Sequence, residues 1–182
     1  ELLDRGCNAM CCTAEGMESA LAALAAPPQL IITDSQVFDK VYNLKPEGST
    51  LTSFSVLFAR YKGDISLFAE GAKRLLSLPP TARILIAEAC THTPQHEDIG
   101  RVKLPRMLRR RLGEEITIDI VGSADFPNDL TPYDLIIHCG ACMFNRQHVM
   151  SRVRRAQEQN IPITNYGIAI AALTGILSRI KY

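Results

Sequence analysis

Short runs of apolar residues alternate along this chain with longer segments in which apolar side chains recur every three or four positions. The runs are rich in β-branched residues, which favours strands, and the longer segments have the spacing of amphipathic helices. Strands that alternate with helices are typical of parallel sheets built from βαβ units. The expected strands are residues 7–12, 29–33, 51–52, 83–89, 115–121, 133–137 and 161–164. The expected helices are residues 13–25, 35–43, 53–61, 65–78, 104–112, 146–160 and 168–180.

Two consecutive prolines, Pro79 and Pro80, separate two series of these elements and indicate a domain boundary. We therefore expect an α/β fold with two small three-layer domains, each a parallel sheet flanked by helices. The expected division is a first domain over residues 1–63, a connecting helix over 64–79 and a second domain over 80–182. Residues 1–5 resemble the end of a helix, so we expect that an N-terminal part of a longer protein precedes them.

The composition favours a packed globular chain. Hydrophobic residues make up 47% and charged residues 21%, and the net charge is +1. Neither nucleic acid nor an anionic membrane is expected as a partner at this charge. No apolar run approaches the roughly 20 residues that span a bilayer, and we expect no signal peptide. Six cysteines in such a chain indicate metal or redox chemistry in a reducing compartment, so we expect a cytoplasmic protein.

Two groups of cysteine and histidine follow two of the expected strands. Cys90 and His92 come directly after residues 83–89, and His138, Cys139 and Cys142 come directly after residues 133–137. Ligands of open parallel sheets gather at the carboxyl ends of the strands. If these two strands are neighbours, three thiols and two imidazoles meet at the same edge.

Cys139 and Cys142 have the spacing that lets two thiolates bind one metal or adjacent irons of a cluster. Together with Cys90 they would bind three irons of a 4Fe–4S cluster. A carboxylate is a hard ligand for iron in a sulfide cluster, so a carboxylate on the fourth iron would be exchangeable. The candidates for the fourth position are His92, His96, Glu97, Asp98, His138 and water.

Three alternatives remain open from the residues alone. Cys139 and Cys142 could form a thiol redox pair, the cysteines and histidines could bind a structural zinc in an interaction module, or the cysteines could be buried without a metal. Spacing does not separate zinc from an iron–sulfur cluster. The other three cysteines lie in an expected buried strand and are predicted to be small core residues: Cys7, Cys11 and Cys12.

Other positions carry weaker signals. Asn165 and Tyr166 follow the strand over residues 161–164 and should face the same edge as the cysteines, which makes them candidates for cofactor binding. A basic run is expected to be a solvated helix face, with a docking surface for an acidic partner or a positive field near an anionic cofactor as the functional alternative. It begins at Arg101, a further candidate for cofactor binding, and its members are Arg101, Lys103, Arg106, Arg109, Arg110 and Arg111.

Several segments together resemble the HydF family, the GTPases and scaffolds of FeFe-hydrogenase maturation. The family's CxH…HCxxC signature is complete here, with 45 residues between His92 and His138. The matching segments span nearly the whole chain and are residues 31–36, 51–55, 58–63, 88–92, 138–142 and 162–167.

This resemblance implies a GTPase domain, a dimerisation domain and a cluster domain in that order. The sequence has no G-x-x-x-x-G-K-[ST] loop, so we expect the GTPase domain to be missing and GTP to bind only there. Residues 1–63 would then be an N-terminally truncated dimerisation domain, and residues 80–182 the iron–sulfur domain. Homodimers through residues 1–63 would bury an apolar helix face that carries Phe54, Leu57 and Phe58.

The resemblance also implies a scaffold that is not an enzyme in this fragment. Cys90, Cys139 and Cys142 would bind a 4Fe–4S cluster, and we favour Glu97 as the exchangeable fourth ligand. The scaffold would receive a di-iron precursor from two radical-SAM maturases as transient cargo and deliver it to apo FeFe-hydrogenase.

Overall fold

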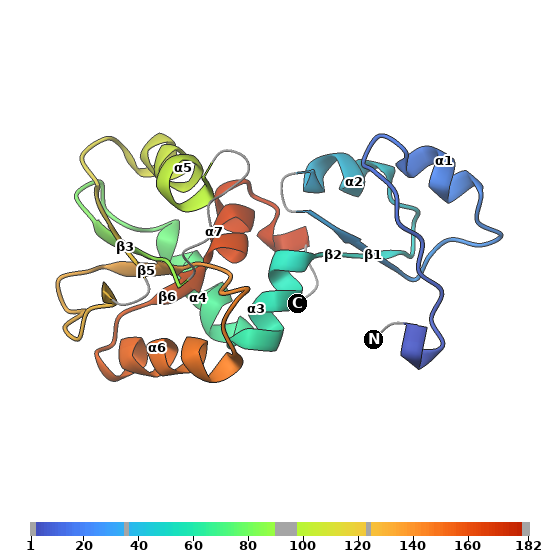
Figure 1. Ribbon diagram of the computed structural model, residues 1–182. Coiled ribbons are helices and arrows are strands. Elements are labelled where there is room, and N and C mark those ends of the chain that lie inside the picture. The colour runs from blue at the N-terminus through green and yellow to red at the C-terminus, as the bar shows by residue number, and fades with distance from the viewer. Residues whose placement is uncertain (1–2, 35–36, 90–97, 123–124, 180–182) are drawn as a thin grey trace.

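A computed structural model of the chain describes residues 3–34, 37–89, 98–122 and 125–179. It contains a two-stranded parallel sheet in the N-terminal part and a four-stranded parallel sheet in the C-terminal part, both packed against helices (Figure 1). The expected α/β class is therefore confirmed. Among the described residues, no helix has the length and apolar character needed to cross a membrane.

The N-terminal part is small and its sheet is short. The two strands pair in parallel from Leu30 opposite Thr50 to Thr33 opposite Ser53. A two-stranded sheet is marginal by itself, and here a helix buries Phe38 and Val41 against it. The elements in chain order are a 3-10 turn at Leu3–Arg5, α1 at Met17–Ala22, β1 at Leu30–Thr33, α2 at Phe38–Leu44 and β2 at Thr50–Ser53.

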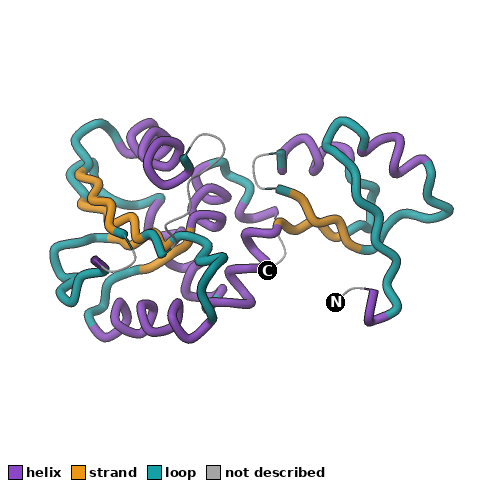
Figure 2. Tube along the Cα trace, in the orientation of Figure 1, coloured by secondary structure: helices purple, strands orange, loops and turns teal. Residues whose placement is uncertain are grey.

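The prediction of a strand at residues 7–12 is wrong. This segment belongs to neither sheet and runs as an irregular loop before α1 (Figure 2). Cys7, Cys11 and Cys12 are exposed rather than buried in a core. The run of small apolar residues has no regular alternation and pairs with no strand, so its backbone forms no ladder.

Two helices lead into the C-terminal part. Ser53 begins α3 (Phe54–Lys62) by accepting a hydrogen bond from Val56 N, and Asp64 begins α4 (Ile65–Leu75) by accepting from Ser66 N at 3.0 Å. In Figure 1, α3 lies between the two sheets. The following helix, α4, packs on the four-stranded sheet, where Thr164 Oγ1 donates to the Phe68 carbonyl at 2.8 Å.

The four-stranded sheet has the order β4–β3–β5–β6, and all of its pairs are parallel. Its central strands, β3 and β5, are buried on both faces. One apolar core joins the sheet to α5 and α7, and a second joins its other face to α6 (Figure 1). The elements are β3 at Arg83–Ala87, a π-helical turn at Ile99–Lys103, α5 at Leu104–Leu112, β4 at Thr117–Val121, β5 at Leu135–His138, α6 at Arg146–Glu158, β6 at Ile163–Asn165, α7 at Tyr166–Leu173 and a 3-10 turn at Leu177–Arg179.

Most expected elements are found, with shorter helices at several ends. The helix expected over residues 13–25 is only α1, and the last helix ends at Leu173 rather than near residue 180. Gly175 has φ +77°, a left-handed conformation that ends the helical path. Two elements therefore extend less far than the apolar pattern suggested.

Candidate metal centre

The two cysteine motifs follow strands that are direct neighbours. β3 pairs with β4 on one side and with β5 on the other, and Ala87 at the end of β3 is opposite His138 at the end of β5. The chain leaves β3 toward β4 on one side and leaves β5 toward β6 on the other, which places a topological switch point between the carboxyl ends of β3 and β5. Parallel α/β sheets bind ligands at such a point, and the pairing of β3 with β5 meets the condition that the sequence argument set.

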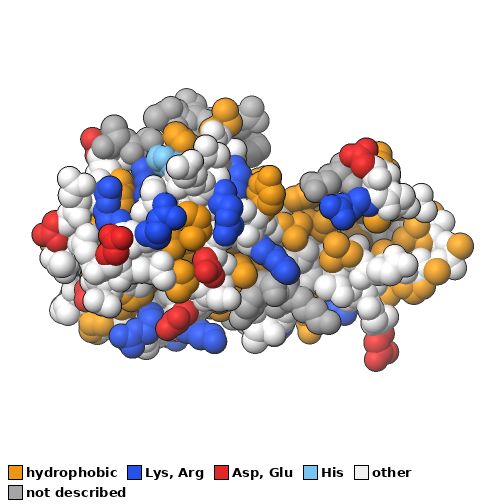
Figure 3. Space-filling view, turned by 90° about the horizontal axis from the view of Figure 1, so that it is seen from below, with side chains coloured by type: hydrophobic (Ala, Val, Ile, Leu, Met, Phe, Trp, Pro, Cys, Tyr) orange, Lys and Arg blue, Asp and Glu red, His pale blue; other side chains and the backbone are white. Residues whose placement is uncertain are grey.

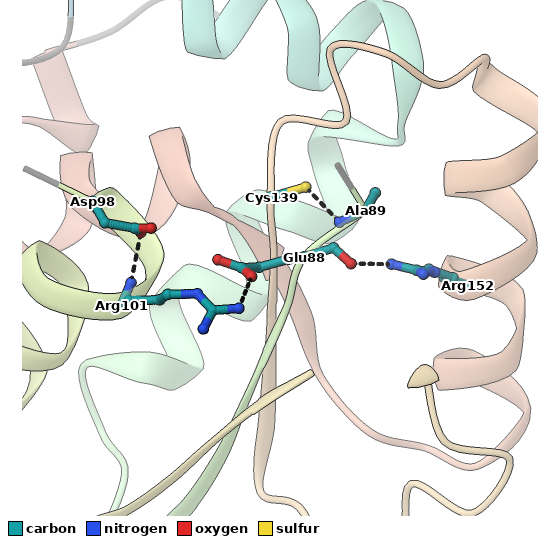
Figure 4. A network of polar contacts seen from close by, with 6 residues as sticks. All are labelled: Glu88, Ala89, Asp98, Arg101, Cys139 and Arg152. Atoms are coloured by element: carbon teal, nitrogen blue, oxygen red, sulfur yellow. Dashed lines mark hydrogen bonds and ion pairs between the residues drawn. The ribbon is translucent and has the colours of Figure 1, made fainter. Parts of the chain in front are cut away.

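Cys139 has the best defined thiol at this edge. Its Sγ accepts a hydrogen bond from Ala89 N at 3.0 Å (Figure 4) and another from Ala141 N at 3.4 Å. Its own N–H donates to the Ala87 carbonyl at 2.9 Å, which ties the CxxC loop to the end of β3. Hydrogen bonds from N–H groups to cysteine sulfurs tune the properties of iron–sulfur clusters.

The loop that follows contains an unusual backbone conformation. Ala141 has φ +47°, in the left-handed region that a residue with a β-carbon rarely adopts, and its side chain is 1% exposed. This turn brings the N–H of Ala141 toward the sulfur of Cys139, and Cys142 follows it as an exposed thiol. The two cysteines of the motif are therefore presented by one tight loop.

A lysine from α3 holds this loop. Lys62 Nζ donates to the carbonyl oxygens of Ala141 at 2.7 Å and Cys142 at 2.8 Å. Lys62 is only 9% exposed, and its ammonium lies 5.3 Å from the ring centre of Phe58. Charged donors make stronger hydrogen bonds than neutral ones, so the contact is a substantial constraint on the loop.

His138 is arranged as an internal hydrogen-bonding residue. It is 1% exposed, its Nδ1 lies 2.7 Å from the Cys139 carbonyl oxygen, and its Nε2 lies 3.1 Å from Nη1 of Arg152. A carbonyl only accepts and a guanidinium only donates, so the proton is on Nδ1. Burial lowers the pKa of His138 to about 4, which keeps the ring neutral. Both ring nitrogens are engaged within the protein in this arrangement.

Charged side chains surround the last residues of β3. Glu88 accepts from Arg101 at 2.9 Å, and its carbonyl lies 3.4 Å from Nη1 of Arg152, so the two guanidinium groups approach it from opposite sides (Figure 4). The carboxylate of Glu88 raises the pKa of Arg101. Asp98 accepts from the backbone N–H of Arg101 at 2.8 Å and caps the turn there. The charges of Arg101 and Arg152 are therefore balanced here by the carboxylates of Glu88 and Asp98, which order the backbone beside the cysteine loop.

Tyr166 lies against the same edge. Its hydroxyl is buried and has no hydrogen-bond partner among the residues that the structure describes. Burial, and then the nearby Cys139 and Glu88, raise the pKa of this hydroxyl, which stays protonated. A β-carbon on Gly100 would lie in contact with the same oxygen, so the ring fits only beside a glycine. The tyrosine retains an O–H donor at the edge where the cysteine loop begins.

The predicted site residues fall into three groups. Cys139, Cys142, His138, Arg101 and Tyr166 lie at the carboxyl edge of the sheet. Asn165 lies at this edge too, but it caps α7 by accepting from Ile168 N at 2.9 Å. The remaining predicted residues are outside the described part of the chain: Cys90, His92, His96 and Glu97.

Within residues 3–34, 37–89, 98–122 and 125–179, no group of three or more His, Cys, Asp or Glu side chains is arranged to hold a metal ion. The donor set that is described nevertheless fits a thiolate-bound group, because Cys139 receives two N–H donors and shares a loop with the exposed Cys142. Ala89, which donates to Cys139, is bonded directly to Cys90.

Two family models match the chain. The hydrogen maturase F dimerization domain matches residues 1–63, and the hydrogen maturase F tetramerization domain matches residues 66–181. The chain belongs to the hydrogen maturase F (HydF) family. Membership gives it a role in FeFe-hydrogenase maturation, and no GTPase domain is found in its 182 residues. A search of curated proteins returned no match.

Sequence reasoning did not identify several residues that shape this site. Lys62 and Glu88 entered only as parts of segments that resemble the family, and Arg146 and Arg152 carried no expectation. Lys62 and its partner Ala141 are 79 positions apart, so no local pattern connects them. The sequence shows only a lysine near the end of an expected helix, which has no distinctive spacing, and its burial is visible only in the structure.

Proposed function

We propose that this chain holds a 4Fe–4S cluster through Cys90, Cys139 and Cys142 and serves as a scaffold in FeFe-hydrogenase maturation. The observation that best supports the proposal is the hydrogen bond from Ala89 N to Cys139 Sγ at 3.0 Å. Because Ala89 is bonded to Cys90, the two cysteine motifs come from strand ends that contact each other.

Each residue would have a distinct task. Cys139 would bind iron as a thiolate that accepts from two backbone N–H groups, and Cys142 would bind from the exposed side of the loop. Glu97 would be the exchangeable fourth ligand, because a carboxylate oxygen is poorly matched to iron in a sulfide cluster. When bound, the cluster supplies an anionic metal–sulfide group with one replaceable position.

Neighbouring side chains would set the environment of the cysteines. Arg101, which pairs with Glu88 at the edge, and Tyr166, which retains a buried O–H, could each donate to a bound anionic group. His138 would act through its hydrogen bonds to the Cys139 carbonyl and to Arg152, which fix the end of β5. His92 would complete the motif. Asn165 would support the edge by capping α7.

The proposed cargo is the di-iron precursor of the hydrogenase cofactor, received from radical-SAM maturases and delivered to apo-hydrogenase. In this fragment the chain would carry the precursor without catalysing a reaction. GTP would bind only to the family's GTPase domain. The cytoplasm is the proposed compartment, because none of the five described cysteines is in a disulfide.

Self-association is the other part of the proposal. Both matching family domains are named for it, and we propose a homodimer through residues 1–63. Exposed hydrophobic side chains are prominent on the N-terminal part, whereas Lys and Arg side chains are spread over the C-terminal part (Figure 3). The face of α3 is a candidate for burial between copies, since its exposed apolar residues are Phe54, Leu57, Phe58 and Tyr61.

Serine substitutions of the cysteines test the ligand assignment. After anaerobic reconstitution with iron and sulfide, Cys90→Ser and Cys139→Ser should lose cluster absorbance, while Cys7→Ser, at an exposed cysteine in the N-terminal loop, should keep it. Glu97→Ala should keep the cluster and change its electron paramagnetic resonance spectrum. Full cluster content in Cys139→Ser would contradict the assignment. Disulfide-exchange activity of the metal-free chain would favour a thiol redox function instead.

A further inference from the structure

Lys62 connects α3 to the cysteine loop through two hydrogen bonds. It is the last residue of α3, within the range matched by the dimerization domain, and its two acceptors lie in the range matched by the tetramerization domain. The Nζ atom lies 2.7 Å and 2.8 Å from the carbonyl oxygens of Ala141 and Cys142. One side chain therefore joins the two matched regions at the loop that carries the thiols.

The two acceptors, the carbonyl oxygens of Ala141 and Cys142, belong to consecutive peptide units of the cysteine loop. Ala141 is held at φ +47°, and its N–H is directed at Cys139 Sγ. A left-handed conformation is unfavourable for a residue with a β-carbon, so other contacts must maintain it. Lys62 binds the carbonyls before and after the α-carbon of Cys142. It thereby fixes the orientation of the residue that carries the exposed thiol.

The end of α3 is itself anchored. Arg146 Nη1, at the start of α6, donates to the carbonyl oxygens of Gly63 at 2.6 Å and Tyr61 at 3.1 Å. A cation suits this position because the carbonyl end of a helix carries partial negative charge. Lys62 thus extends from a fixed helix end, and its 9% exposure keeps water from competing for the loop carbonyls.

We propose that Lys62 is a positioning residue for the metal centre, which sets the distance and direction of Cys142 relative to Cys139. This role rests on the proposed cluster binding, while the contact between Lys62 and the loop exists without a cluster. The same contact gives α3, and any association through residues 1–63, a direct connection to a cysteine that would bind iron.

The test compares Lys62→Met with Lys73→Met, which removes an exposed lysine from the neighbouring helix α4. Methionine keeps the apolar stem of the side chain and removes the ammonium donor. In the metal-free chain, amide hydrogen exchange of residues 140–144 should become about tenfold faster or more in Lys62→Met, because the loop loses two charge-assisted bonds. It should stay at the wild-type rate in Lys73→Met. Equal rates in the two variants would overturn the inference.

A second measurement follows the metal centre. After reconstitution, the reduced cluster of Lys62→Met should show a shifted or broadened electron paramagnetic resonance spectrum, while that of Lys73→Met should superimpose on wild type. A wild-type spectrum in Lys62→Met would overturn the positioning role. If wild-type protein binds no cluster, the proposed function fails, and the exchange rates still decide whether Lys62 holds the loop.

A measurement on wild-type protein covers the case in which Lys62→Met does not fold. An amine-acylating reagent should modify Lys62 at least about tenfold more slowly than Lys73, as quantified by mass spectrometry, because the Lys62 amine is buried and hydrogen-bonded. Comparable rates would show that the ammonium does not occupy the loop and would overturn the inference.

Discussion

Gly167 of α7 lies directly against the first turn of α3, where the N-terminal and C-terminal parts meet. A β-carbon added at Gly167 would clash with the β-carbon of Ser55. It would also lie 2.9 Å from the Oγ and 3.2 Å from the Cα of Ser55. Separations this short occur in no folded protein, so Gly167→Ala must push α3 away from α7. Since α3 carries Lys62, the shift reaches the cysteine loop as well.

The net effect combines two opposing terms. Alanine is favoured over glycine within a helix by up to about 1 kcal/mol. Carbon atoms pack about 3.5–4 Å apart, so the helices must separate by more than about 1 Å, and overpacking of this kind costs about 1–3 kcal/mol. Because the displaced groups include backbone, we expect the upper part of this range and a net loss of about 2 kcal/mol in the free energy of unfolding.

Urea denaturation of the metal-free chain measures this loss, and a double-mutant cycle identifies its cause. Ser55→Gly removes the β-carbon and hydroxyl that obstruct the new methyl group, so Gly167→Ala should cost about 1–2 kcal/mol less in that background. Gly140→Ala is the control, since a β-carbon there would meet nothing within 4 Å. Unchanged stability in Gly167→Ala, or the same cost with and without Ser55, would refute the close contact between α3 and α7.

Three further substitutions test the packing around the site. Gly71→Ala should destabilise the chain by about 2 kcal/mol in urea denaturation, because the new methyl group would meet the backbone of Ile163, and stabilisation would refute the packing of α4 on β6. His138→Phe should cost about 2 kcal/mol in the metal-free chain, because Arg152 loses a buried acceptor; no change in the calorimetric midpoint would contradict an internal hydrogen-bonding role. Asp64→Ala should cost about 1 kcal/mol through loss of the α4 cap, measured against the exposed substitution Lys73→Ala, and equal stability of the two would contradict it.

The sequence was informative where local chemistry decides the structure. The helix over residues 104–112 was predicted with its observed bounds, since Pro105 favours a helix start and Gly113, at φ +111°, ends it. The placement of both cysteine motifs at strand ends also followed from the pattern. That β3 and β5 are neighbours was only a condition of the argument, because strand order depends on long-range packing.

Prediction failed where distant contacts decide. Residues 7–12 are apolar enough for a buried strand, but no strand pairs with them among the described residues, so the exposed cysteines were assigned to the wrong environment. The role of Lys62 depends on a turn 79 residues away, and no spacing rule joins the two. The metal-ligand prediction for His138 stays a prediction, and the hydrogen bonds of its two ring nitrogens, which only the folded chain creates, could not be read from the motif.

The proposed 4Fe–4S cluster is tested most directly by the content of iron, zinc and acid-labile sulfide in protein reconstituted and purified without oxygen. We expect about four iron atoms and four sulfides per chain, with little zinc. Stoichiometric zinc without sulfide, or a chain that binds neither metal, would contradict it.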